Sequence, residues 1–258
     1  MVEVTIDGQK TEVEKGTTAL EAARALGIEV PTLCYHEGLP PDGNCRLCQV
    51  DVTELGRSKL VISCMYPIKR SVEINTNTPA VREARAFVLK LLLTRSPHSP
   101  VLQQLAEEYG VEPLDERFAP GGEPDLCIRC GRCVRACADL GNCLGFVGRG
   151  WEKEVNTPFR EPTADCRGCA ACAEVCPTGA IRVVEDEEAG TRTIWGRTFD
   201  LVACEVCGDL FATREQIEAV EPGYEMKGLR LLCPRCRRIA EAREVGAGVG
   251  SREEKKKE

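Results

Sequence analysis

Two groups of four cysteines near the middle of the chain constrain this sequence more than any other feature. They are Cys127, Cys130, Cys133 and Cys137, followed by Cys166, Cys169, Cys172 and Cys176. Each group reads Cys-x2-Cys-x2-Cys-x3-Cys, and a loop with this spacing can wrap three thiolates around one face of a [4Fe–4S] cubane. Two zinc knuckles fit less well, because zinc sites pair one Cys-x2-Cys with a distant second pair. The two groups therefore predict two [4Fe–4S] clusters.

The fourth cysteine of each group is expected to reach the cluster of the other group. In the bacterial ferredoxin pattern, three close thiolates hold one cubane, and the fourth, at the start of a short helix, ligates the neighbouring cubane. Cluster A is then held by Cys127, Cys130, Cys133 and Cys176, and cluster B by Cys166, Cys169, Cys172 and Cys137. This crossed arrangement predicts a two-cluster ferredoxin domain over residues 121–186.

The 17 cysteines also bound the architecture of this 258-residue chain. Without them the apolar share falls from 43 % to about 36 %, so several small domains stabilised by metal are expected instead of one large core. Met1–Lys10 does not resemble a signal peptide, and no run of 18 apolar residues occurs. We therefore expect metal ligands, not disulfides, in a cytoplasmic protein without a transmembrane segment. The net charge of −7 argues against nucleic acid as a partner.

Residues 1–78 are predicted to form a β-grasp domain that holds a [2Fe–2S] cluster. Its opening signals are an alternating strand over Val2–Ile6, a hairpin turn at Asp7-Gly8 and a helix capped by Thr17 or Thr18 that ends near Leu26. Four cysteines follow, namely Cys34, Cys45 and Cys48 on a loop and Cys64 at the end of an expected strand over Leu60–Cys64. Plant-type [2Fe–2S] centres are held in this way, although their first gap is four residues and not ten. Zinc is the alternative, and it is weakened because Cys34 has no close partner.

The sequence segments around these cysteines resemble a known family. PTLCYHEGLPPDGNCRLCQVDV, LVISCMYPI, CIRCGRCVRAC, LGFVGRGWEKEVNTPF and DCRGCAACAEVCPTGAI are similar to the N-terminal part of the large iron–sulfur subunit of complex I. They also resemble the diaphorase-side iron–sulfur subunits of NAD(P)-linked hydrogenases and formate dehydrogenases. The resemblance covers roughly residues 1–185. It implies an electron-transfer subunit that works beside a flavoprotein.

Residues 79–120 are predicted to be a helical connector that departs from this family. A helix over Val81–Leu93, with an apolar stripe at Ala84, Phe87, Val88 and Leu91, precedes a second helix over Val101–Tyr109. The relatives hold a further cubane here with one His and three Cys, but no cysteine lies between Cys64 and Cys127. That cluster is therefore expected to be absent, and His98 to be a surface or capping residue. Closer packing of the two cluster domains, or a partner subunit, must then bridge the gap.

Several residues between the predicted ligands have two interpretations. Arg129, Arg132 and Arg135 are expected to form a solvated face, although guanidinium groups near an anionic cluster would raise its reduction potential. Cys143 is expected to be a small buried apolar residue and not a ligand.

Four further cysteines mark a unit near the C-terminus. Cys204, Cys207, Cys233 and Cys236 form Cys-x2-Cys-x25-Cys-x2-Cys, a pattern that favours tetrahedral structural zinc in a zinc-ribbon-like unit over residues 195–245. A further iron–sulfur cluster is the alternative. The segment resembles the C-terminal ribbon of iron–sulfur subunits in formate hydrogenlyase-type complexes. A helix over Thr213–Val220 is expected, with Thr213 and Gln216 in capping-box positions, and residues 246–258 are expected to be a disordered tail.

Together these patterns predict an α+β, multi-domain chain with one [2Fe–2S] cluster, two [4Fe–4S] clusters and one zinc. No dinucleotide fingerprint, P-loop or nucleophile–base set is apparent in the sequence, so we expect a non-catalytic redox subunit. It would pass single electrons between a flavin subunit that handles NAD(P)H and a catalytic subunit of hydrogenase or formate dehydrogenase type. The alternatives are a stand-alone ferredoxin-like carrier and a subunit of a reductase that acts on an organic substrate.

Overall fold

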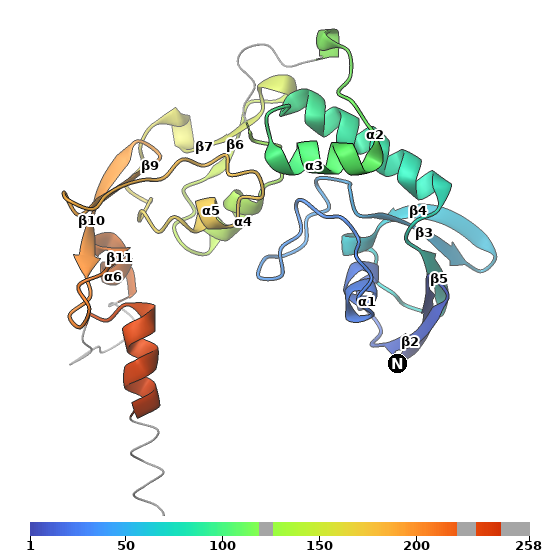
Figure 1. The fold of residues 1–258 in the computed structure, drawn as a ribbon, viewed down its shortest axis with the longest axis horizontal. Helices are drawn as coiled ribbons and strands as arrows, with labels where there is room; N and C mark the ends of the chain where they lie inside the picture. The colour runs from blue at the N-terminus through green and yellow to red at the C-terminus, as the bar shows by residue number, and fades with distance from the viewer. Residues whose placement is uncertain (119–125, 221–230, 244–258) are drawn as a thin grey trace, which may run out of the picture. The chain divides into compact units, whose positions relative to one another are not determined.

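The computed structural model describes residues 1–118, 126–220 and 231–243 (Figure 1). The chain divides into two compact units. The first unit comprises Met1–Pro158 and Ala171–Ile181, and the second comprises Phe159–Ala170 and Arg182–Glu258. The predicted tail, residues 246–258, lies outside the described residues. No helix among the described residues is long and apolar enough to cross a membrane.

A five-stranded sheet forms the N-terminal part of the first unit. Its strands are β1 (Val2–Ile6), β2 (Gln9–Val13), β3 (Gln49–Glu54), β4 (Arg57–Ile62) and β5 (Val72–Asn75), in the order β2-β1-β5-β3-β4. All neighbours are antiparallel except β1 and β5, which run parallel. Ile6 pairs with Gln9, so Asp7 and Gly8 form the two-residue turn, and both have positive φ. The predicted hairpin is therefore confirmed.

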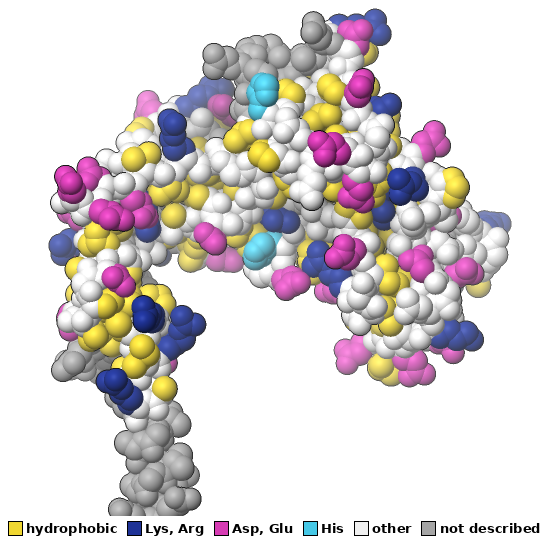
Figure 2. All heavy atoms as spheres, in the orientation of Figure 1, with side chains coloured by type: hydrophobic (Ala, Val, Ile, Leu, Met, Phe, Trp, Pro, Cys, Tyr) yellow, Lys and Arg dark blue, Asp and Glu magenta, His cyan; other side chains and the backbone are white. Residues whose placement is uncertain are grey.

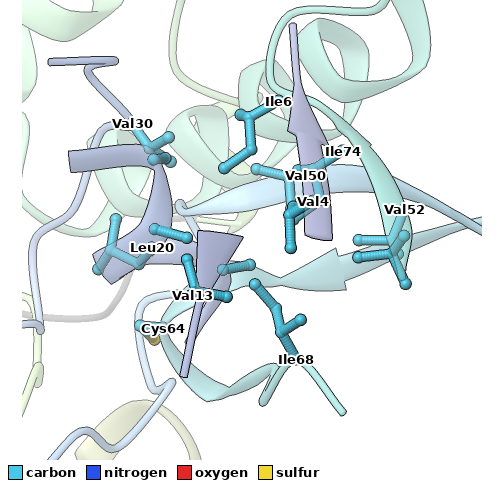
Figure 3. Packing of buried hydrophobic residues seen from close by; sticks show 14 of the residues in the cluster. Val4, Ile6, Val13, Leu20, Val30, Val50, Val52, Cys64, Ile68 and Ile74 are labelled. Carbon is cyan, nitrogen blue, oxygen red and sulfur yellow. The ribbon is translucent and has the colours of Figure 1, made fainter. Parts of the chain in front are cut away.

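Helix α1 (Ala19–Ala25) covers this sheet and begins with the predicted cap. The Thr18 hydroxyl accepts a hydrogen bond from the Glu21 N–H, and the Glu21 carboxylate accepts one from the Thr18 N–H. The buried face of α1 meets the sheet in the first core, which contains Val4, Ile6, Val13, Leu20, Val30, Val50, Val52, Ile68 and Ile74. Figure 3 shows side chains of both elements in this core, with Cys64 among them. The first core thus includes the predicted cluster ligand Cys64.

Two helices, α2 (Pro79–Arg95) and α3 (Pro100–Tyr109), pack on each other after the sheet. Thr78 caps α2, and Pro79 occupies its first turn. The predicted apolar stripe is wrong in part, because Phe87 and Leu91 are 58 % and 41 % exposed. The buried face of α2 instead carries Val81, Arg85, Leu89 and Leu93. The reason is tertiary: Arg85 donates to the carbonyl of Gln49 on β3, which turns this face inward.

The central part of the first unit contains α4 (Arg132–Ala138), β6 (Gly145–Val147), β7 (Glu154–Asn156) and α5 (Ala171–Glu174). Short 3-10 turns are η1 (Ser63–Met65), η2 (Glu116–Phe118), η3 (Gly150–Glu152) and η4 (Pro158–Arg160), which begins at the last residue before the second unit. Strands β6 and β7 form an antiparallel pair. One expectation needs correction: Cys137 lies in the last turn of α4 and not at its start. The spacing of four residues instead puts Cys133 and Cys137 on one face of the helix.

The second unit contains a four-stranded antiparallel sheet. Its strands are β8 (Val184–Asp186), β9 (Thr191–Ile194), β10 (Arg197–Ala203) and β11 (Leu210–Thr213), in the order β11-β10-β9-β8. The sheet begins at Val184, which is upstream of residue 195, where the unit was expected to start. Helix α6 (Arg214–Val220) opens with reciprocal bonds between Thr213 and Gln216, so the predicted capping box is confirmed. Residues 234–243 are also helical.

Candidate metal centres

The first candidate centre consists of Cys34, Cys45, Cys48 and Cys64. All four side chains are buried. Three of them lie on the irregular loop between α1 and β3, as predicted, but Cys64 lies in the turn η1, because β4 already ends at Ile62. Gly43 shapes the loop at φ +64°, and a Cβ atom there would lie 2.9 Å from the Met65 Cγ. The backbone of the loop can therefore approach η1 closely.

The four thiols of this centre interact in two pairs. A side-chain hydrogen bond with Cys34 lowers the pKa of Cys45 to about 6, and one with Cys64 lowers the pKa of Cys48 to about 6. The partner thiols shift in the opposite direction, because each of them keeps the shared proton: the pKa of Cys34 and that of Cys64 are raised. The electrostatic influence of Cys34 also reaches Cys48 and Cys64. The structure thus gathers all four thiols predicted to hold the [2Fe–2S] cluster.

The second candidate centre brings three thiols of the first central group close to one thiol of the second group. Burial raises the pKa of Cys130 to about 11, and the Cys176 and Cys127 thiols act in the same direction. Burial also raises the pKa of Cys133 to about 12, with Cys130, Cys127, Cys172 and Cys176 as further causes. Cys176 is therefore close enough to interact with the first group, as crossed ligation requires. The assignment of these four residues to cluster A stays a prediction.

The residues assigned to cluster B are divided between the two units. Cys137 and Cys172 belong to the first unit, where α4 and α5 pack on each other. Cys166 and Cys169 belong to the second unit, on the loop that precedes α5. The assignment of these four cysteines to one cluster also stays a prediction.

Cys143 is more than the buried apolar residue that the sequence indicated. Its side chain is buried, and its Sγ lies 3.3 Å from the Sγ of Cys137. Its backbone N–H also donates to the same sulfur over 3.4 Å. The residues before Cys143 return the chain to α4, since the Gly141 and Asn142 N–H groups donate to the Cys137 carbonyl. Cys143 therefore contacts a predicted cluster ligand. The only sequence signal for this contact is an extra cysteine six residues after Cys137, outside the regular spacing of the quartet.

The arginines between the central cysteines do not form the solvated face that was expected. Arg135 donates to the carbonyls of Cys34, over 2.6 Å, and of Pro40. Arg132 donates to the carbonyl of Tyr35, and burial lowers the pKa of its guanidinium group. The Nε atoms of both side chains are buried and have no acceptor among the described residues. These arginines connect the loop of the first centre to α4.

Apolar packing supports the same connection between the first two centres. The second core combines residues of the first loop (Leu33, Cys34, Cys45, Leu47), of α2 and α3 (Leu89, Leu93, Leu102, Ala106) and of the central segment (Ile128, Cys130). On the loop side, the Asn44 amide also donates to the Arg129 carbonyl over 3.1 Å. His98 is exposed, which agrees with its expected place at the surface. Helices α2 and α3 contribute an apolar core here; that closer packing or a partner subunit replaces the missing cluster stays a prediction.

The third candidate centre, in the second unit, has four thiols within a small volume. The sulfur atoms of Cys204, Cys207, Cys233 and Cys236 all lie within 4.8 Å of one another. The Cys207 and Cys233 sulfurs are 3.7 Å apart. Backbone N–H groups of Cys207 and Cys233 lower the pKa of Cys204 to about 6, so this residue is poised to act as a thiolate. The structure therefore assembles the four cysteines that were predicted to bind zinc.

Charge on the surface of the first unit is mixed. On the face shown in Figure 2, Lys and Arg side chains are interspersed with Asp and Glu among the described residues of this unit. This distribution offers no extended basic surface there for a phosphate backbone.

Comparison with known proteins gives two domain matches. Residues 1–79 match a family described as 2Fe-2S iron-sulfur cluster binding domain, and residues 165–210 match one described as 4Fe-4S dicluster domain. The chain therefore contains a [2Fe–2S]-type domain and a [4Fe–4S]-type domain with mixed helix and sheet content. The second match extends across Cys204 and Cys207.

Among the similar proteins are two curated relatives and one solved structure. The chain is 36 % identical over 209 residues to NADP-reducing hydrogenase subunit HndD of Solidesulfovibrio fructosivorans, covering 70 % of this chain and 36 % of that protein. It is 36 % identical over 206 residues to the NADH-ubiquinone oxidoreductase 75 kDa subunit of Reclinomonas americana, covering 70 % and 29 %. A chain in the crystal structure of an NAD+-reducing [NiFe]-hydrogenase in the H2-reduced state matches with a TM-score of 0.59 and 28 % identity, covering 69 % of this chain and 86 % of that one. The chain thus spans only about a third of the length of these two curated relatives.

Proposed function

We propose that this chain passes single electrons through one [2Fe–2S] and two [4Fe–4S] clusters. The reason is its homology, over about 70 % of its length, to the iron–sulfur electron-transfer subunits of the complex I-like family. The observation that carries the proposal is that cysteines of two candidate centres pack in one hydrophobic core. Cys34 and Cys45 of the first centre and Cys130 of the second share the second core. Two redox groups held in this way would be close enough for direct exchange.

The donor set at the first centre fits a [2Fe–2S] cluster. Four thiols converge there, and they influence one another's pKa mainly in two pairs, Cys34 with Cys45 and Cys48 with Cys64, as a cluster that binds two thiolates at each iron requires. The buried Nε atoms of Arg132 and Arg135 are donors without an acceptor among the described residues. The sulfur atoms of an anionic cluster would supply acceptors for such donors.

The thiols of the central groups fit [4Fe–4S] clusters by their number and spacing. We assign Cys127, Cys130, Cys133 and Cys176 to cluster A on their spacing and on the electrostatic coupling of Cys176 to Cys130 and Cys133; Cys172, assigned to cluster B, also couples to Cys133. We assign Cys166, Cys169, Cys172 and Cys137 to cluster B on their spacing alone. When bound, the clusters supply carriers that change by one electron.

The residues of the chain hold these carriers and control their surroundings. Buried side chains of the second core, such as Leu47 and Ile128, exclude water and so lower the local dielectric constant. Arg132 and Arg135 fix the first loop against α4 through backbone carbonyls, and their positive charges favour the reduced form of a nearby cluster. Both effects help to fix the distance between the clusters and the reduction potential of each cluster.

We propose zinc at the third centre, with a role in structure only. Zinc–sulfur bonds of about 2.3 Å in a tetrahedron place neighbouring sulfurs about 3.8 Å apart, close to the 3.7 Å between Cys207 and Cys233. A cubane would separate its thiolates further, because four irons and four sulfides lie between them. The alternative of a further iron–sulfur cluster is favoured by one observation, the extension of the [4Fe–4S] domain match across Cys204 and Cys207. Metal analysis of the purified chain distinguishes the two.

The proposed partners are a flavoprotein that exchanges hydride with NAD(P)H and a catalytic subunit of hydrogenase or formate dehydrogenase type, in a cytoplasmic complex. A relative is named as a subunit of an NADP-reducing hydrogenase, and the matched structure is of an NAD+-reducing [NiFe]-hydrogenase. Three metal modules in one chain favour a subunit over a stand-alone carrier, which needs only one cluster domain. A subunit of a reductase for an organic substrate is the other alternative.

An anaerobic assay of the full chain, purified with its clusters, tests this function. We expect the chain to accept electrons from dithionite, with electron paramagnetic resonance signals of one [2Fe–2S] and two [4Fe–4S] clusters. It should not reduce a dye with NADH, NADPH, H2 or formate, because these donors deliver electron pairs and single-electron carriers cannot split a hydride. Addition of the flavoprotein partner should start dye reduction by the matching nicotinamide. Sustained dye reduction by the chain alone would show that it contains a catalytic site.

A further inference from the structure

A hairpin in the second unit connects the third candidate centre, called here the four-cysteine centre, to a loop. This loop carries Cys166, a predicted ligand of cluster B, and leads to Cys169, another predicted ligand. Strands β10 and β11 pair with Leu201 opposite Thr213 and Ala203 opposite Leu210. The turn between these strands contains Cys204 and Cys207, so this turn is one half of the four-cysteine centre. Farther from the turn, β10 and β11 contact the loop over residues 163–168, called here the ligand loop.

The ligand loop is held almost entirely through its backbone carbonyls. Arg197, the first residue of β10, donates from Nη1 to the carbonyls of Thr163 (2.8 Å), Ala164 (3.1 Å) and Cys166 (2.7 Å). One guanidinium nitrogen can bond three carbonyls only if the loop curves around it. The carbonyls that follow Cys166 meet two other side chains of the sheet.

Two neighbouring side chains of the sheet also hold the ligand loop. The Thr213 hydroxyl, at the end of β11, donates to the Arg167 carbonyl. Arg192 on β9 donates to the Gly168 carbonyl over 3.0 Å and pairs with Glu185 over 2.7 Å. The ligand loop has no strand or helix of its own in this range. Its conformation therefore depends on the sheet.

Close apolar packing seats the ligand loop on the same hairpin. Gly168 has φ +65°, and a Cβ atom there would lie 2.6 Å from Phe199 Cδ2 and 2.9 Å from Thr213 Cγ2. Phe199 is buried, and the Arg197 guanidinium group stacks over its ring at 4.7 Å. A residue larger than glycine at this position would displace the loop. Hydrogen bonds and packing thus act on the same few residues that precede Cys169.

We infer that the four-cysteine centre, which transfers no electrons as a zinc site, acts on cluster B by fixing the β10–β11 hairpin that positions Cys166 and Cys169. The inference rests on the proposed function for the presence of cluster B. Metal binding supplies folding free energy to small units, and here it closes the hairpin at the turn. The hairpin then presents Arg197 and Thr213 at fixed positions to the ligand loop. Arg197 is accordingly a positioning residue for the cluster and not one of its ligands.

The first test replaces the guanidinium group and keeps its charge. Arg197→Lys should weaken the three carbonyl bonds, because a flexible, strongly hydrated ammonium lacks the rigid planar group that stacks on Phe199 and holds Nη1 against the loop. In the full chain with its clusters, we expect faster loss of iron to a chelator and a changed resonance signal from one [4Fe–4S] cluster only. The [2Fe–2S] signal should not change. The matched control is Arg214→Lys, since Arg214 is an exposed arginine of the same unit that lies outside the ligand loop and the contacts that hold it.

The second test removes the metal of the four-cysteine centre. In Cys236→Ser, zinc content should fall, and the same [4Fe–4S] cluster should lose iron as it does in Arg197→Lys. If this variant does not fold, graded chelation of the unaltered chain replaces it, with the signal of that cluster plotted against zinc content. Loss of zinc without any change in that cluster would overturn the inference, as would identical behaviour of Arg197→Lys and Arg214→Lys. A chain that contains no [4Fe–4S] clusters before any substitution would instead refute the proposed function.

Discussion

The contact between Arg135 and the first cysteine loop allows a quantitative prediction. Arg135 donates to the carbonyl of Cys34 in a half-buried setting and to the carbonyl of Pro40 in an exposed one. The change Arg135→Ala removes both bonds and leaves the Cys34 carbonyl without this donor. The apolar residues of the second core remain in place, so we expect local loosening and not global unfolding.

The magnitude follows from the number and setting of these bonds. A hydrogen bond from a charged donor contributes about 1.5 kcal/mol at the low end of its range, and solvent screening reduces the exposed one to about half of that. Arg135→Ala should therefore lower the free energy of opening of the loop by about 2 kcal/mol, which corresponds to about a 30-fold increase in the population of the open loop. The reduction potential of the [2Fe–2S] cluster should also fall, because a positive charge near it is lost.

Hydrogen exchange of the full chain, followed by mass spectrometry, measures this effect. Amides over residues 33–48 should exchange about 30-fold faster in Arg135→Ala, while the hairpin Val2–Val13 should keep its protection. The control is Arg149→Ala, because Arg149 is an exposed arginine of the same unit that lies outside the contacts with this loop. Equal exchange in both variants would refute the reasoning, and so would a uniform loss of protection throughout the first unit.

Three further results are expected. Cys176→Ser should damage the cluster A signal and Cys137→Ser that of cluster B, as resonance spectroscopy of each variant can decide; damage confined to the quartet that contains the substitution would contradict crossed ligation. Cys143→Ala should shift the potential of cluster B but preserve its iron, because the Cys143 sulfur lies 3.3 Å from the Cys137 sulfur; loss of that cluster's iron would mean that Cys143 is itself a ligand. Leu47→Ala should lower the free energy of unfolding by about 2–5 kcal/mol in urea titrations, since Leu47 is completely buried in the second core; a change below about 1 kcal/mol would contradict its role there.

Features that depend on neighbours in the chain were predictable from the sequence. The Asp7-Gly8 turn, the Thr18 cap and the Thr213–Gln216 capping box are formed by residues no more than three positions apart. Spacing of the cysteines is a covalent constraint of the same kind, because a short loop limits which thiols can reach one metal group. Such signals do not require knowledge of the rest of the fold.

Other features were decided by residues that are distant in the sequence. Arg135 and Cys34 are 101 positions apart, and Thr213 and Arg167 are 46 positions apart. The sequence pattern indicated a solvated face for the arginines and an apolar stripe through Phe87 and Leu91, and both expectations changed when tertiary partners were present. The arginine contacts could not be predicted because their acceptors are backbone carbonyls. Every residue has a backbone carbonyl, and no sequence pattern shows which of them will accept a hydrogen bond from a given side chain. Packing alone determines that Arg132, Arg135 and Arg197 bind loops that carry cysteines.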